Sequence, residues 1–162
     1  MALLMVGIGG LEASCDRSAV LKTMALGSCI AVMILDPGAR CVAMVHIALP
    51  DSTIAPDKAR TLPGYFADTG IPALLTAMLA AGAKADRSRY IVKLVGGANV
   101  SDPNNTFNIG KRNALAIKKI LWTLGLVPKA EDIGGRISRT VSLEASTGKV
   151  RVTSPGRPEW EV

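Results

Sequence analysis

Two apolar segments follow each other in the first third of the chain, separated only by a short turn. The first is "CIAVMILD", the turn is "DPGA", and "CVAMVHIAL" follows almost at once. Continuous apolar runs of this length, bounded by turn residues, are typical of strands that are covered on both faces. We therefore predict an antiparallel hairpin in which both strands are largely buried.

The rest of the chain alternates further strands with two helical segments. The first helix is expected from Pro72 to about Gly82, and the second from about Lys111 to Leu124, where Gly125 ends it. "MALLMV" and "RYIVKLV" read as strands, and "RTVSLEASTGKVRVTS" has the alternation of a half-exposed hairpin. This order predicts an α+β fold, a layered α/β/β sandwich of mostly antiparallel strands with two main helices on one side.

The length and composition indicate one domain. The chain has 162 residues, of which 49% are hydrophobic and 20% charged, so it is long enough for one core and too apolar to be disordered. We expect a single domain over residues 1–154 and a flexible C-terminal tail over 155–162. Between Leu49 and Ile71 the sequence has several prolines and no periodicity, which predicts a long irregular loop.

The apolar content raises the question of a membrane. No uninterrupted run approaches the roughly 20 apolar residues that a bilayer crossing needs. The first residues also lack the leading positive charges of a signal peptide. We expect a cytoplasmic protein without membrane insertion.

The formal net charge of +6 is compatible with more than one kind of partner. The basic residues are spread along the chain, and few aromatic side chains accompany them for stacking on bases. A solvated helix face or an acidic protein partner explains the charge as well as nucleic acid does. We predict no nucleic-acid partner.

The three cysteines, Cys15, Cys29 and Cys41, are an odd number without metal-ligand spacing. This pattern indicates neither a disulfide scaffold nor a zinc site, and no metal is expected. In a cytosolic protein all three thiols are expected to be reduced.

Cys29 is the best candidate for a nucleophile. It follows Gly27 and Ser28, small residues that let backbone N–H groups approach a substrate carbonyl and stabilise an oxyanion. His46, the only histidine of the chain, follows on the next strand and is the only imidazole that can act as its base. A buried thiol beside a structural core histidine is the alternative, and the residues alone leave both interpretations open.

A second glycine turn, "GGAN", follows the strand "RYIVKLV". Gly97 permits positive φ and close backbone approach, and Asn99 offers an amide for contact with a substrate. A purely structural turn is an equally good interpretation.

Several ordered motifs resemble one family. "TMALGSCIAVMILD" and "AMVHIALP" are followed by "KLVGGANV", "NIGKRN", "EDIGGRISRTV" and "TGKVRV", and "VGIGG" precedes them. This set, which covers nearly the whole chain, resembles the CheD family of chemoreceptor glutamine deamidases. The family's nucleophile then falls on Cys29, its general base on His46 and its third triad member on Thr23.

The resemblance implies a cysteine-dependent protein-glutamine deamidase. Such an enzyme converts glutamines on the cytoplasmic part of chemoreceptors to glutamate through a thioester, without a metal or organic cofactor. Two alternatives stay open. One is a regulatory binding partner of the chemotaxis phosphatase CheC, and the other is a thiol hydrolase of other acyl groups such as glutamate methyl esters.

Overall fold

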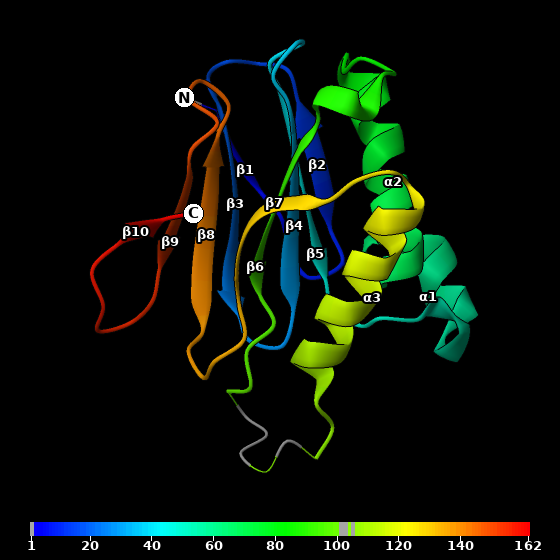
Figure 1. The fold of residues 1–162 in the computed structure, drawn as a ribbon, viewed down its shortest axis with the longest axis vertical. Coiled ribbons are helices and arrows are strands. Elements are labelled where there is room, and N and C mark those ends of the chain that lie inside the picture. Colours follow the sequence, from blue (N-terminus) through cyan, green and yellow to red (C-terminus); the bar gives the residue numbers. More distant parts are fainter. Residues whose placement is uncertain (1, 101–103, 105) are drawn as a thin grey trace.

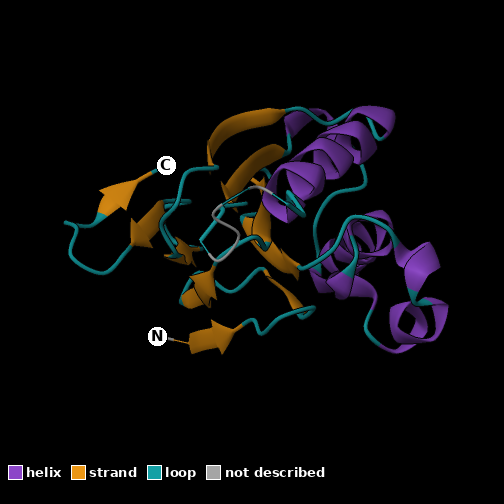
Figure 2. Cartoon of the chain, turned by 90° about the horizontal axis from the view of Figure 1, so that it is seen from below, coloured by secondary structure: helices purple, strands orange, loops and turns teal. Residues whose placement is uncertain are grey.

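The computed structural model describes residues 2–100, 104 and 106–162 and has three layers. Two five-stranded sheets lie face to face, and the helices cover the outer face of one of them (Figure 1). Figure 2, turned by 90°, shows the helices gathered on this one side. The prediction of an α+β layered sandwich with mostly antiparallel strands is confirmed.

Each sheet has five strands. The first sheet has the order β1-β3-β8-β9-β10, with β1 Ala2–Met5, β3 Ala19–Leu26, β8 Arg139–Glu144, β9 Val150–Thr153 and β10 Trp160–Glu161. The second has the order β2-β5-β4-β6-β7, with β2 Leu11–Ser14, β5 Cys41–Ile47, β4 Ile30–Asp36, β6 Ile91–Gly96 and β7 Pro128–Ile133. Strand β1 runs parallel to β3 and β6 parallel to β7, whereas the other named pairs are antiparallel.

The predicted hairpin is β4 paired with β5, and every residue of both strands is buried. Alternate side chains of β4 enter two different apolar clusters. Ile30 and Ile34 face the helices, whereas Ala31 and Met33 face the first sheet. Because β4 lies in the middle of the second sheet and that sheet lies between the helices and the first sheet, the hairpin has no polar face, as its continuous apolar sequence indicated.

Two long helices, α2 (Ala67–Ala81) and α3 (Ile109–Thr123), pack on the second sheet. Helix α3 matches the predicted segment closely, and Gly125 follows it with φ of 76°. Helix α2 begins five residues before Pro72, so this proline lies inside the helix and not in its first turn.

The expectation of an irregular loop between Leu49 and Ile71 is wrong. The segment contains a 3₁₀ turn at Ser52–Ile54, helix α1 at Pro56–Thr61, a second 3₁₀ turn at Pro63–Tyr65 and the start of α2. Helices of three to six residues are too short to produce a hydrophobic repeat, so the sequence pattern could not reveal them.

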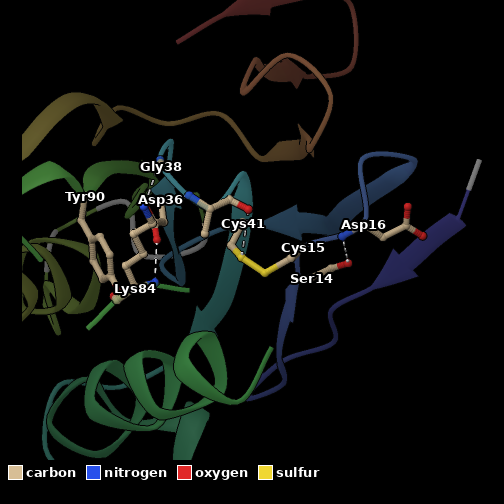
Figure 3. Close-up of a disulfide and its surroundings, with 9 residues drawn as sticks. Ser14, Cys15, Asp16, Asp36, Gly38, Cys41, Lys84 and Tyr90 are labelled. Atoms are coloured by element: carbon tan, nitrogen blue, oxygen red, sulfur yellow. Dashed lines mark hydrogen bonds between the residues drawn. A yellow bond between two sulfur atoms is a disulfide. The ribbon is translucent and has the colours of Figure 1, made fainter. Parts of the chain in front are cut away.

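The expectation that all three thiols are reduced is also wrong, because Cys15 and Cys41 form a disulfide (Figure 3). Strand β2 pairs antiparallel with β5 so that Ser14 lies opposite Val42. The next residues outward in this register are Cys15 and Cys41, whose Cα atoms are 4.1 Å apart. The disulfide depends on the register between two strands that are distant in sequence, and the spacing of the cysteines does not encode this register. Cys29 is the one cysteine with a free thiol.

The terminal segment 155–162, expected to be a tail, contains strand β10, which pairs with β9. The indole Nε1–H of Trp160 donates to Asp132 at 2.6 Å, and the Lys93 ammonium donates to a main-chain oxygen of Val162 at 2.8 Å. In the described part of the chain, no helix is both long and apolar enough to cross a membrane.

Candidate active site

Cys29 and His46 lie on the same face of the second sheet. Cys29 directly precedes β4, and His46 lies on β5 opposite Ala31. Side chains alternate along a strand, so Cys29 and Ala31 point to one face, and Cys29 packs with Ala31 in the cluster between the sheets. The thiol and the imidazole are therefore diagonal neighbours on adjacent strands, within the space between the two sheets.

Thr23 reaches the imidazole from the other sheet. It lies on β3, is completely buried, and its Oγ1 is 2.6 Å from His46 Nδ1. The same hydroxyl donates to the carbonyl of Val6 at 2.6 Å. Because a hydroxyl has a single hydrogen, Oγ1 must accept from His46 and the hydrogen of the ring must be on Nδ1. The lone pair of Nε2 is then available to take a proton.

His46 is buried with 2% of its surface exposed, and this burial lowers its pKa to about 4. The neutral imidazole is thus the form present at neutral pH. Its Nε2 atom is also buried and has no hydrogen-bond partner among the residues that the structure describes. A buried, unpaired acceptor is costly in a fold, and such atoms often mark a functional position.

The Cys29 side chain is half-buried, and burial raises the pKa of its thiol. Its own backbone N–H partly opposes this effect by favouring the thiolate. The resting pair is therefore a neutral thiol and a neutral imidazole. A nucleophilic thiolate at this position needs a base that takes the thiol proton.

The backbone around Cys29 is held by the glycine turn after β6. The carbonyl of Gly27 accepts from the N–H of Ala98, and the carbonyl of Cys29 from the N–H of Gly97, both at 2.8 Å. A Cβ atom on Gly96, where φ is 122°, would be 2.2 Å from the Cys29 oxygen. Glycine is required at this position because two segments of backbone meet there.

The other predicted site residues gather beside Cys29. Ser28, Gly97 and Asn99 line a cavity of about 500 Å³ at the start of α3. Gly27 belongs to the same turn and has open space where a side chain would stand. The structure thus brings the predicted residues together, and their contacts with a substrate stay predictions. Across the described ranges, no group of three or more His, Cys, Asp or Glu side chains is arranged to hold a metal ion.

Asn113 is a site residue that the sequence reasoning missed. It lies on α3, is completely buried, and its Nδ2 donates to the carbonyls of Ser28 and Ala48, both at 3.0 Å. A signal was present in the sequence, because Asn113 shares helical spacing with the buried Ile117 and Leu121. A polar residue on the apolar face of a helix points to a specific hydrogen-bonding role.

The chain is similar in sequence to proteins of one family. Residues 48–154 match the family model described as CheD chemotactic sensory transduction. A probable chemoreceptor glutamine deamidase CheD of Syntrophotalea carbinolica is 49% identical over 162 residues, which are all of both chains. The chemoreceptor glutamine deamidase CheD of Thermotoga maritima is 39% identical over 155 residues, covering 96% of this chain and 94% of its own.

The fold and the site define a layered α+β protein with a cysteine and a histidine between two sheets. The match to the family model begins after His46, but the relatives' alignments cover essentially the whole chain, including the segment of Thr23, Cys29 and His46. The chain belongs to the CheD family.

Proposed function

We propose that this protein is a chemoreceptor glutamine deamidase that works through a covalent thioester on Cys29. The observation that carries the proposal is the hydrogen bond between Thr23 and His46, which leaves Nε2 of the imidazole free as a base on the same sheet face as the thiol. The names of full-length relatives support the substrate class.

The reaction begins with proton transfer from the Cys29 thiol to His46 Nε2 as the sulfur attacks the carboxamide carbon of a glutamine side chain. The carbonyl oxygen becomes an oxyanion, which the backbone N–H groups of Ser28 and Cys29 stabilise. His46 then returns the proton to the amide nitrogen, and the C–N bond breaks. Ammonia leaves, and the acyl group stays on Cys29 as a thioester.

A water molecule completes the cycle. His46 takes a proton from the water as the water oxygen attacks the thioester carbon. His46 then returns this proton to the sulfur as the C–S bond breaks, which releases glutamate and restores the Cys29 thiol. Throughout both halves, Thr23 keeps the Nδ1 hydrogen of His46 in place. Every proton and bond is balanced without any further reactant.

Substrate contacts are assigned to the cavity beside the nucleophile. Ser28, Gly97 and Asn99 line it, and because Ser28 directly precedes Cys29 in the chain, we assign the glutamine side chain of the substrate to this cavity. We assign to Gly27 and Gly97 the role of letting the substrate approach the backbone closely, and to Asn99 a contact with the substrate amide. The substrate is the cytoplasmic part of a chemoreceptor, so the protein acts in the cytoplasm.

The function is tested by the product released from a cytoplasmic chemoreceptor fragment. Ammonia released from a fragment with glutamines at the modification sites supports the deamidase. Methanol released from a methylated fragment, without ammonia, would instead identify a glutamate methyl esterase. If neither product forms and the phosphatase CheC binds tightly, a regulatory binding role replaces the enzymatic one.

A further inference from the structure

We propose that Asn113 is a positioning residue for the oxyanion step, because it fixes the direction of the Cys29 backbone N–H. The inference rests on the proposed deamidase function. It assigns a role to a side chain that belongs neither to the nucleophile nor to its base.

Asn113 contacts the peptide unit that joins Ser28 to Cys29. The carbonyl of Ser28 and the N–H of Cys29 belong to the same planar trans peptide, in which they point in opposite directions. Asn113 Nδ2 donates to that carbonyl at 3.0 Å. Holding the carbonyl therefore sets where the N–H points.

The carbonyls on either side of Ser28 are held differently. The oxygens of Gly27 and Cys29 are held by backbone N–H groups of Ala98 and Gly97. The oxygen of Ser28, between them, is held by a side chain. Of these three successive peptide orientations, the one that carries the nucleophile's own N–H thus depends on Asn113.

The side-chain amide of Asn113 makes a second contact. Nδ2 also donates to the carbonyl of Ala48, with 3.0 Å between nitrogen and oxygen. Ala48 lies two residues beyond His46. One side chain therefore links the turn that carries the nucleophile with the strand that carries the base. Asn113 therefore contacts both segments without touching either of the proposed reacting atoms.

Packing alone does not explain an asparagine here. Ile117 and Leu121, on the same helix face, are apolar and completely buried. Asn113 is equally buried, and its Oδ1 has no hydrogen-bond partner among the described residues. An apolar residue would avoid the loss of hydration, so the polar side chain is best explained by the two carbonyls that it holds.

The test compares turnover with thiol reactivity in Asn113→Ala. Alkylation of Cys29 by iodoacetamide needs the thiol and its base but develops no oxyanion. We expect kcat for a receptor fragment to fall by about 10- to 100-fold, as for loss of an aligned oxyanion donor, with KM within about twofold. The rate of alkylation should also stay within about twofold.

Asp36→Ala is the matched control. Asp36 is 2% exposed, lies at the opposite end of β4 from Cys29, and accepts from the backbone N–H groups of Gly38 and Lys84. Its loss should destabilise the fold, as Asn113→Ala does, but keep turnover near that of the wild type. If Asn113→Ala does not fold, Asn113→Ser, with one remaining donor, is measured by the same criteria.

The outcomes separate the two proposals. A wild-type protein that releases no ammonia refutes the proposed function, and the inference about Asn113 is refuted with it. An active wild type whose folded Asn113 variant turns over within about twofold of normal refutes only the inference. An equal loss of alkylation and turnover also refutes it, because the nucleophile itself would then be disturbed.

Discussion

His46 is the base in the proposed reaction, and its protonation is coupled to folding. An unfolded histidine has a pKa of about 6.5, whereas burial lowers the pKa of His46 to about 4. Between these pH values the unfolded chain binds a proton that the folded protein does not. The contribution of His46 to stability is therefore complete above pH 6.5 and is lost as the pH falls toward 4.

We expect this linkage to lower the free energy of unfolding by up to about 3 kcal/mol between pH 6.5 and 4. Urea unfolding of the wild type and of His46→Gln, measured over this range, isolates the effect, because the chain has only one histidine. Acidic side chains titrate in both proteins, so their contribution cancels when the two pH dependences are compared. Identical pH dependence in the two proteins would contradict the lowered pKa.

Thr23 acts on the imidazole through a single hydroxyl, so its removal should be visible in the tautomer. Thr23→Val keeps the shape and removes the acceptor for Nδ1–H. We expect nitrogen NMR to show the neutral ring shifting from the Nδ1–H to the Nε2–H form, and kcat to fall at least about tenfold.

Thr23→Ser is the control for this change. It retains the hydroxyl and should keep both the tautomer and most of the turnover. A valine variant with an unchanged tautomer would show that Thr23 does not orient the ring.

The candidate site residues could be named from the sequence, but their contacts with one another could not. Cys29 stood out through its Gly-Ser turn, and His46 through being the only histidine. Thr23 entered only through family resemblance, since its contact joins two different sheets and leaves no local pattern. Asn113 did leave a local signal, a polar residue on an apolar helix face, although its two carbonyl partners lie far away in sequence.

Among the secondary-structure elements, the glycine turn after β6 has a specific task beside the nucleophile. At Gly96 a Cβ atom would meet the Cys29 carbonyl oxygen. Gly96→Ala should therefore displace the start of β4, reduce stability and reduce turnover of the receptor fragment.

Gly125→Ala provides the comparison for this prediction. Gly125 also has positive φ, but it ends α3 in open space. Because alanine is strained in the left-handed backbone, Gly125→Ala should lower the free energy of unfolding by roughly 1–2 kcal/mol, with no loss of turnover. Full activity in Gly96→Ala would show that the close approach does not constrain the site.

Elements with a long repeat were predictable, and short ones were not. The β4–β5 hairpin, strand β8 and helix α3 follow from runs or alternation of six residues or more. Helix α1 has six residues and no buried stripe to reveal it. The N-terminal segment contains two strands in different sheets, β1 and β2, which only tertiary pairing separates.

For the molecule as a whole, the disulfide lies away from the chemistry. Cys41 begins β5, whereas His46 lies near its end, five positions or roughly 17 Å along the strand. The bond closes a sequence separation of 26 residues and should stabilise the fold by about 3 kcal/mol.

We expect thiol titration of the unfolded, unreduced protein to detect one free thiol, and three after reduction. Cys15→Ala and Cys41→Ala should lower the midpoint of urea unfolding while turnover stays nearly intact. Three free thiols before reduction would contradict the disulfide.

The most direct test of glutamine deamidation by this fold uses the wild type and Cys29→Ala side by side. Each is incubated with a cytoplasmic chemoreceptor fragment from the same cell, and conversion of glutamine to glutamate is scored by peptide mass. We expect conversion by the wild type alone, with Cys29→Ala folded but inactive, since a small half-buried side chain is replaced by a smaller one. Equal conversion by both proteins would contradict a cysteine nucleophile, and no conversion by either would contradict the deamidase function.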